Sequence, residues 1–362
     1  MGPLPGAERA PTQGSTKHAR KKPLGSVAGT AALLLAAVIS FMPTNFVVES
    51  PGPTLDTMGE LEGTELVSLL GAETYPSDSR LDMTTVFVQG GGQNRVTVPV
   101  ILEALVNSSK DVVAEETVIP RGVTSDQMSE QNDSMMVSSQ ELSVAAAFNE
   151  LDIPFTTELY VAGFGNDTNS AVLEEDDQLL AINQTPVTNL NQLKGELNDR
   201  GDEPSTLTVR RGEQTVDEVV TTQPGEDGTR QIGVFLRSSY IFDPQINFGV
   251  QDIGGPSAGM MFALAIIDKM TEGSLAGDTH VAGTGAITDE GEVEPIGGIA
   301  QKLVASQRAG AEVFLAPEDN CPDVQGRVPR GLDVVKVSTL SEAREALERI
   351  AQGTDPGELP TC

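Results

Sequence analysis

The sequence predicts a mixed α+β and α/β protein with one transmembrane helix near its amino terminus. Three observations lead to this prediction. An uncharged apolar run spans residues 24–42, β-type segments dominate residues 158–222, and strand-type and helix-type segments alternate from residue 232 onward. The 362 residues are enough for two or three domains.

Charge is distributed unevenly along the chain. Lys and Arg number 23 and Asp and Glu number 53, which gives a formal net charge of −30. Residues 1–22 hold five basic residues and one acid, so the acid excess lies entirely in the remainder. Such an excess argues against a nucleic-acid partner, and two His and two Cys are too few for a metal site built from these residues.

The apolar run Leu24–Met42 has the length of a membrane anchor. At about 1.5 Å per residue it spans roughly 29 Å, close to the thickness of a bilayer core. We therefore expect a cytoplasmic basic tail over residues 1–23, an anchor over residues 24–48, and a single-pass protein of the cell membrane whose remainder is extracytoplasmic. The alternatives are a cleaved secretory signal, although no small-residue cleavage site follows the run, and a buried core helix.

The region from residue 49 to residue 238 mixes one long helix with many strands. Residues 81–89 predict a strand, residues 121–133 a polar loop and residues 134–151 a helix. Beyond these, the strands expected are 159–162, 178–183, 205–210 and 215–221, with a short amphipathic helix through Leu190, Leu193 and Leu197.

From residue 232 onward the pattern is that of an α/β domain, which begins with a strand at 232–236. Residues 257–270 are apolar nearly all round, which predicts a buried helix. Strands are expected at 280–287, 312–316 and 332–337, and helices at 299–308 and after an N-cap at Ser341. Residues 351–362 are expected to form a carboxy-terminal tail.

The two cysteines, Cys321 and Cys362, fall on the side of the anchor that we expect to be oxidising. A disulfide between them would close a loop of about 42 residues and contribute roughly 4 kcal/mol in the chain-entropy model. The alternative is two unpaired thiols.

A glycine- and proline-containing loop leads into the buried helix. Gly255 and Pro256 fix a tight turn, and Ser257 is expected in the first helical turn, where free backbone N–H groups favour an oxyanion. Acyl transfer to a serine needs this arrangement. An ordinary serine N-cap is the alternative interpretation.

A serine nucleophile needs a base, and the sequence offers two candidates. His280 is the only histidine beyond the apolar run. Lys302 has apolar neighbours at Ile299 and Leu303, and desolvation there would lower its pKa from about 10.4 towards neutrality. A neutral amine can accept the proton of Ser257. The alternatives are a Ser-His hydrolase and a solvated lysine.

Together these segments resemble the proteolytic domain of the Lon protease family. The resemblance rests on GGPSAG at 254–259, GTGAITDEGEVEPIGGIAQK at 283–302 and AGAEVFLAP at 309–317. It implies Ser257 as nucleophile, Lys302 as general base, Thr284 as a neighbour of the lysine, and a hexameric ring as the form of a homo-oligomer. It also implies a Lon-type proteolytic domain over 239–350. The sequence departs from the family at Gly254, Ala286 and Gln301.

The chain contains no G-x-x-x-x-G-K-[ST] loop for ATP phosphates, so we expect no cofactor. It is therefore similar to the membrane-anchored, ATP-independent Lon-like proteases that carry a PDZ domain. Residues 171–187 resemble a bacterial PDZ core, which assigns residues 153–238 to a PDZ-like domain. Such domains bind extended peptides by strand addition, and we expect the carboxylate-binding loop near residues 153–157. A purely structural β-rich segment is the alternative.

We expect the PDZ-like domain to be inserted into a discontinuous protease domain, whose first part is residues 49–152. A separate amino-terminal domain is the alternative. The function implied is a Ser-Lys endopeptidase that cleaves unfolded or membrane-tethered extracytoplasmic proteins or peptides. A non-catalytic PDZ adaptor or holdase is the competing hypothesis.

Overall fold

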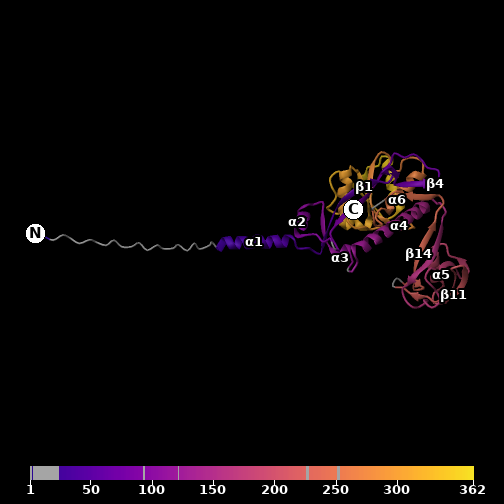
Figure 1. The fold of residues 1–362 in the computed structure, drawn as a ribbon. Coiled ribbons are helices and arrows are strands. Elements are labelled where there is room, and N and C mark those ends of the chain that lie inside the picture. Colours follow the sequence, from indigo (N-terminus) through magenta and orange to yellow (C-terminus); the bar gives the residue numbers. More distant parts are fainter. Residues whose placement is uncertain (1, 3–23, 93, 121, 226–227, 251–252) are drawn as a thin grey trace.

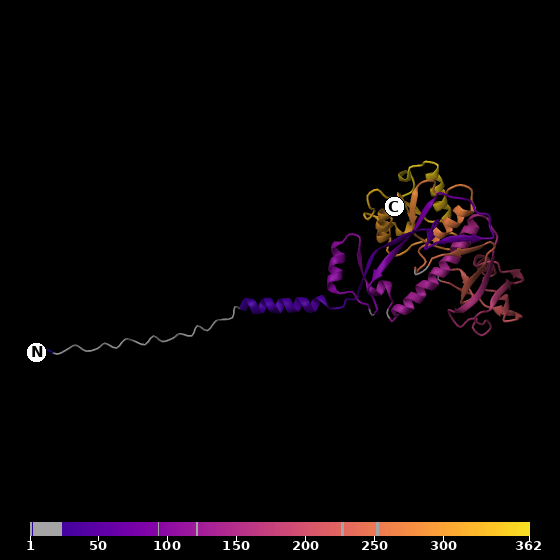
Figure 2. The same cartoon turned by 45° about the horizontal axis from the view of Figure 1, so that its top comes forward.

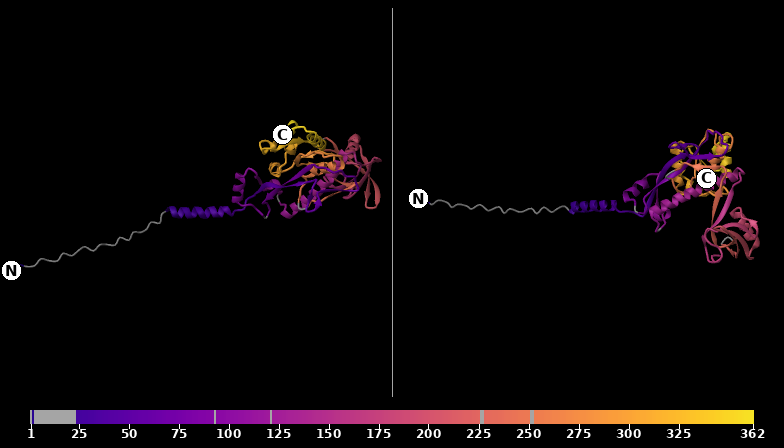
Figure 3. Two further views of the ribbon diagram at one scale, coloured as in Figure 1. Left: turned by 90° about the horizontal axis from the view of Figure 1, so that it is seen from above. Right: turned by 45° about the vertical axis from the view of Figure 1, so that its right-hand side comes forward.

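The computed structural model describes residues 2, 24–92, 94–120, 122–225, 228–250 and 253–362 (Figure 1). It has a mixed α/β fold with two lobes. The core lobe contains both the early strands and the carboxy-terminal third of the chain, and the β-rich lobe consists of residues 156–241. Helix α1, Leu24–Ser40, points away from both lobes in Figures 2 and 3.

The core lobe is built on one six-stranded sheet with the order β20-β19-β16-β5-β1-β6. Strands β5, β16, β19 and β20 are parallel, and β1 pairs antiparallel with β5 and β6. The strands are β1 Phe46–Asp56, β5 Arg80–Gln89, β6 Asp111–Ala114, β16 His280–Gly283, β19 Val313–Pro317 and β20 Asp333–Val337. The sheet thus combines strands that precede the β-rich lobe with strands that follow it.

Helices cover both faces of this sheet. Successive residues of β19 point to opposite faces, so that Val313 and Leu315 join one hydrophobic core while Phe314 joins another. The first core contains α4 Ser125–Glu150, α6 Gly259–Met270 and α9 Leu340–Ala351. The second contains α7 Ile299–Ala309 and α8 Cys321–Val324. Helix α6 is buried from Gly259 to Asp268, as its apolar sequence predicts.

The β-rich lobe has its own core around Leu159, Leu179, Leu193 and Leu207. Its sheet has the order β11-β10-β8-β7-β14, and the short β9 pairs with β8. The elements are β7 Thr156–Phe164, β8 Gln178–Ile182, β9 Thr185–Pro186, α5 Leu190–Arg200, β10 Ser205–Arg211, β11 Gln214–Val220 and β14 Val234–Ile241. The limits of the expected domains stay a prediction.

Short elements complete the fold. They are β2 Glu60–Leu61, β3 Thr64–Glu65, β4 Val67–Leu70, α2 Val98–Val106, α3 Glu115–Val118, β12 Gln223–Pro224, β13 Arg230–Gln231, β15 Gln245–Phe248, β17 Ala286–Ile287, β18 Val293–Glu294 and the 3₁₀ turns Glu318–Asn320 and Pro356–Glu358.

Two local expectations were wrong because helix caps were misplaced. Residues 125–133 belong to helix α4 and not to a polar loop, since Thr124 and Gln127 form a capping box that starts the helix early. Helix α9 is capped by Thr339, which accepts a hydrogen bond from Glu342 N–H, and not by Ser341.

The expected transmembrane helix was also wrong. Within the described residues, no helix is both long and apolar enough to cross a membrane. Helix α1 has 17 residues, or about 26 Å, and Pro43 disfavours helical backbone at the residue before it. Residues 46–48, expected in the anchor, belong to strand β1. This finding contradicts the expected localisation as a single-pass membrane protein, which depended on the anchor. The basic tail, residues 1–23, lies outside the described residues apart from Gly2.

Candidate active site

Ser257, Thr284 and Lys302 meet on the core lobe although they lie on three different elements. Ser257 ends the loop before α6, Thr284 follows β16, and Lys302 is in the first turn of α7. Lys302 Nζ lies 2.7 Å from Ser257 Oγ and 2.8 Å from Thr284 Oγ1. The structure therefore brings together the three polar side chains that the sequence singled out.

Burial sets the charge state of the lysine. Lys302 is 1% exposed, and desolvation by this burial lowers its pKa to about 7. The carboxylate of Glu49 on β1 opposes the shift by favouring the ammonium form. A large fraction of Lys302 is therefore an uncharged amine near neutral pH, in contact with the hydroxyl of Ser257.

Helix α4 holds the loop that carries Ser257. Gly255 N–H donates to the carbonyl of Asn132 at 2.8 Å, and Ser139 Oγ donates to the carbonyl of Pro256 at 2.9 Å. Gly254 packs so closely on α4 that a Cβ there would lie 2.7 Å from Asn132 Cβ. Gly255 has a φ of +90°, which disfavours any residue with a side chain. The close approach to α4 and the positive φ explain Gly254 and Gly255 of the motif.

Ser257 itself lies just before the helix and not in its first turn. Helix α6 begins at Gly259 with Ala258 as its N-cap. The carbonyl of Ser257 accepts hydrogen bonds from Thr284 Oγ1 and from Gly285 N–H, each at 2.9 Å. The residues that follow β16 thus fix the backbone of Ser257 as well as contacting Lys302.

A cleft of about 300 Å³ is lined by Ser257 and Lys302. Its walls include Thr84–Phe87 of β5, Gly254 and Gly297. Strand β16 pairs with β5 only over Arg80–Met83. In the part of the chain that the structure describes, the edge of β5 beyond Met83 therefore has no partner strand on the side of the cleft.

His280 does not belong to this site. Its Nε2 lies 2.9 Å from Oδ2 of the buried Asp82. His280 begins β16 whereas Thr284 follows its end, so about 13 Å of extended chain separates the two residues. A Ser-His arrangement with Ser257 is therefore not what this fold provides.

Sequence reasoning missed Glu49, Asn132 and Ser139. Each lies more than 100 positions from the residue that it affects and belongs to no recognisable motif. Only the pairing of β1 with β5 and the packing of α4 against α6 bring them to the site. The capping box formed by Thr124 and Gln127 was the one sequence feature that indicates that α4 begins before Asn132.

Cys321 and Cys362 form a disulfide in the structure. It joins α8 to the end of the chain, where Leu359 is buried and the Pro360 carbonyl accepts a hydrogen bond from Lys336 N–H. The disulfide and these contacts attach the carboxy-terminal tail to the core lobe.

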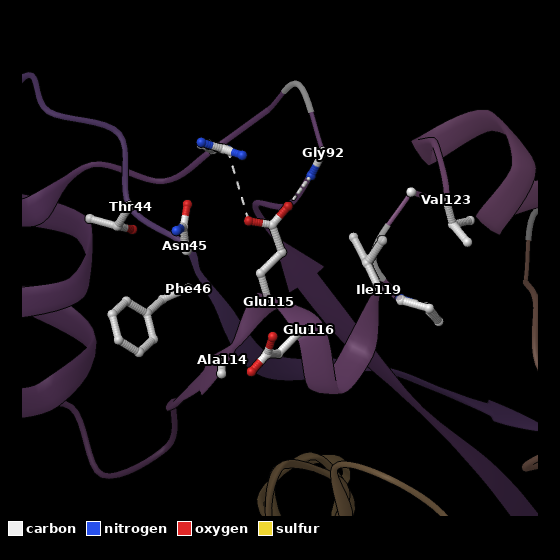
Figure 4. Close-up of a pocket in the computed structure, with 12 residues that line it drawn as sticks. Thr44, Asn45, Phe46, Gly92, Ala114, Glu115, Glu116, Ile119 and Val123 are labelled. Atoms are coloured by element: carbon white, nitrogen blue, oxygen red, sulfur yellow. Dashed lines mark hydrogen bonds and ion pairs between the residues drawn. The ribbon is translucent and has the colours of Figure 1, made fainter.

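A larger cavity of about 810 Å³ lies elsewhere, beside α3 (Figure 4). In it Glu115 accepts a hydrogen bond from Gly92 N–H at 2.7 Å and lies 3.9 Å from Arg95. It contains neither Ser257 nor Lys302. Among the described residues, no cluster of His, Cys, Asp and Glu could hold a metal ion.

Known proteins are similar to part of the chain. The Lon protease of Rhizobium meliloti is 39% identical over 114 residues, which are 30% of this chain and 14% of that protein. The Lon protease of Roseiflexus castenholzii is 41% identical over 91 residues, which are 24% of this chain and 11% of that protein. The chain thus spans a small part of the length of these relatives.

Among solved structures, the PDZ domain of the SdrC-like protein from Listeria monocytogenes is 17% identical and covers 22% of this chain and 85% of that one. Its TM-score of 0.20 supports no conclusion about the β-rich lobe. Residues 246–351, which carry Ser257, Thr284 and Lys302, match the Lon protease (S16) C-terminal proteolytic domain.

Proposed function

We propose that this chain is a serine endopeptidase with a Ser257–Lys302 dyad that cleaves unfolded proteins without ATP. The observation that carries the proposal is the buried Lys302 amine, with its pKa lowered to about 7, at 2.7 Å from Ser257 Oγ. The match of residues 246–351 to a protease domain supports the same chemistry. The 362 residues contain no ATP-phosphate loop.

In the proposed reaction, Ser257 Oγ attacks the carbonyl carbon of the scissile peptide bond while Lys302 Nζ accepts its proton. Lys302 then protonates the leaving amine, and water hydrolyses the acyl-enzyme by the same proton transfers. Within the described residues, the backbone N–H groups of Ser257 and Ala258 donate no hydrogen bond. We assign them to the oxyanion.

The free edge of β5 supports an extended substrate. A peptide that pairs with residues 84–89 would pass over the cleft that holds Ser257. Phe87 is 60% exposed and Val88 is 43% exposed on this part of the strand. Both offer apolar contact to substrate side chains, which favours unfolded chains over folded ones.

For recruitment of a peptide by the β-rich lobe, we propose a groove away from residues 153–157. Residues 153–157 pack at the junction of the two lobes, where Phe155 contacts Phe148. A cavity of about 490 Å³ lies instead between α5 and the start of β14. It is lined by Leu193 and Leu197 of α5 and by residues 230–236. Lys194 provides positive charge for a peptide carboxylate, whereas Arg230 is paired with Asp202.

Cleavage of fluorescently labelled, unfolded casein by the full chain tests this function. We expect cleavage by the wild type and by His280→Ala, equal rates with and without ATP and Mg²⁺, and none with Ser257→Ala. Casein that binds but stays intact would support the adaptor or holdase instead. Cleavage lost in His280→Ala would support a Ser-His hydrolase. The hexameric ring stays a prediction, which a measurement of the molar mass in solution by light scattering would test.

A further inference from the structure

The turn between β17 and β18 joins the two lobes. At its tip, the consecutive residues Asp289 and Glu290 both contact the β-rich lobe. Tyr240 Oη donates to Asp289 Oδ2 at 3.1 Å, and Asn191 Nδ2 donates to Glu290 Oε1. Asn149 at the end of α4 donates to the carbonyl of Asp289 at 2.7 Å. One short turn is therefore held from both sides of the junction.

The two contacts from the β-rich lobe come from the two elements that form its groove, α5 and β14. Asn191 lies on α5, whose leucines line the groove. Tyr240 lies on β14, whose first three residues line the opposite wall. Any displacement of α5 relative to β14 would therefore act on Asp289 and Glu290.

The other end of the same hairpin holds the catalytic serine. Strand β17 follows directly after Thr284 and Gly285, which donate the two hydrogen bonds to the carbonyl of Ser257. Thr284 Oγ1 also contacts Lys302 Nζ. Met260 N–H donates to the carbonyl of Gly285 at 3.1 Å, so the start of α6 is tied to the same residues.

Tyr240 is well suited to a fixed contact. Its ring stacks on Phe242 with a centroid distance of 5.7 Å and an interplanar angle of 13°. Phe242 in turn packs against Phe148 of α4 at 5.5 Å. Burial raises the pKa of Tyr240 to about 12, so its hydroxyl remains a hydrogen-bond donor over the ordinary pH range.

We propose that Tyr240 and Asn191 are positioning residues that hold the 284–291 segment, and through it Ser257, in the geometry needed for catalysis. The inference rests on the proposed function of the dyad and deepens it: occupation of the groove between α5 and β14 would change the geometry of the dyad through the Asp289–Glu290 turn. The β-rich lobe then regulates cleavage as well as binding substrate.

Tyr240→Phe in the full chain tests the proposal, because it keeps the ring stack and removes one hydroxyl. The matched control is Tyr160→Phe, since Tyr160 Oη donates to Glu158 at 2.7 Å in the same lobe without touching the turn. The first readout is hydrogen exchange at the Gly285 amide. The second is cleavage of a short fluorogenic casein peptide.

We expect the Gly285 amide to exchange about three- to tenfold faster in Tyr240→Phe and at the wild-type rate in Tyr160→Phe. We expect kcat to fall by about the same factor with KM within about twofold, because the substrate contacts are unchanged. Asn191→Ala should behave like Tyr240→Phe.

Wild-type exchange at Gly285 in both Tyr240→Phe and Asn191→Ala would overturn the proposal, whatever their activity. Equal effects in the Tyr160→Phe control would overturn it too. If the wild-type chain cleaves nothing but Gly285 exchanges faster in Tyr240→Phe, the proposed function is wrong. The connection from Tyr240 through the Asp289–Glu290 turn to Ser257 would still be supported.

Discussion

The charge state of Lys302 gives the sharpest test of the mechanism. The amine is 1% exposed, and burial lowers its pKa to about 7 while Glu49 partly opposes this effect. Only the neutral amine can accept the proton of Ser257. The rate of cleavage should therefore follow the fraction of chains with an uncharged lysine.

The size of the effect follows from the pKa. With a value of about 7, roughly 9% of the lysine is neutral at about pH 6 and roughly 91% at about pH 8, so kcat/KM should rise about tenfold between them. With an ordinary lysine pKa of about 10.4, less than about 1% would be neutral at pH 8.

Glu49→Gln removes the charge that raises the pKa of Lys302, so the midpoint of the pH–rate profile should move to lower pH. The assay is kcat/KM for a short peptide over the pH range of stable folding. Glu103→Gln, on the exposed side of α2, is the control and should leave the midpoint in place. A wild-type midpoint above about pH 9 would contradict a lowered pKa of Lys302, and the same midpoint in Glu49→Gln would contradict the effect of Glu49 on it.

Three further predictions concern stability and the shape of the site. Lys302→Met should abolish cleavage but raise the free energy of unfolding near pH 7, by at most roughly 5 kcal/mol, because the folded pKa lies below the unfolded one. The free energy of unfolding of the wild type should accordingly rise between about pH 7 and pH 10.5. Urea unfolding at these two pH values should therefore show a smaller difference between Lys302→Met and the wild type at the higher pH. Gly254→Ala should lower activity and cost about 1–3 kcal/mol because its Cβ meets α4, whereas Gly297→Ala, with open space around it, should cost less than about 1 kcal/mol in the same unfolding assay. Reduction of the Cys321–Cys362 disulfide should lower the midpoint of thermal unfolding, since the closed loop contributes about 4 kcal/mol, and an unchanged midpoint would contradict this.

The sequence predicted best those parts of the site that are local in the chain. The loop before α6 and the first turn of α7 each carry their glycines and their functional residue within a few positions, so Ser257 and Lys302 could be singled out. Their partner Glu49 could not, because it reaches the site only through strand pairing with β5. Residues 46–48 of β1 were assigned to the expected anchor, and hydrophobic periodicity does not say which strands lie side by side.

The errors have equally local causes. The apolar run from Leu24 suggested a membrane span, but composition alone does not show that the helix ends at Ser40, three residues before Pro43. The polar segment before residue 134 suggested a loop, but a capping box at Thr124 gives a polar sequence a helical start. The cavity between α5 and β14 could not be predicted, because these two elements are not adjacent in the chain.

The most direct test of the central claim is casein cleavage by Lys302→Gln beside the wild type, at about pH 8 and with folding checked by circular dichroism. Glutamine keeps most of the volume of the side chain but cannot accept the proton of Ser257. If Lys302 is the base, the rate should fall at least about a hundredfold while the spectrum stays native. Cleavage by Lys302→Gln at the wild-type rate would show that another group activates Ser257, and the dyad would have to be abandoned.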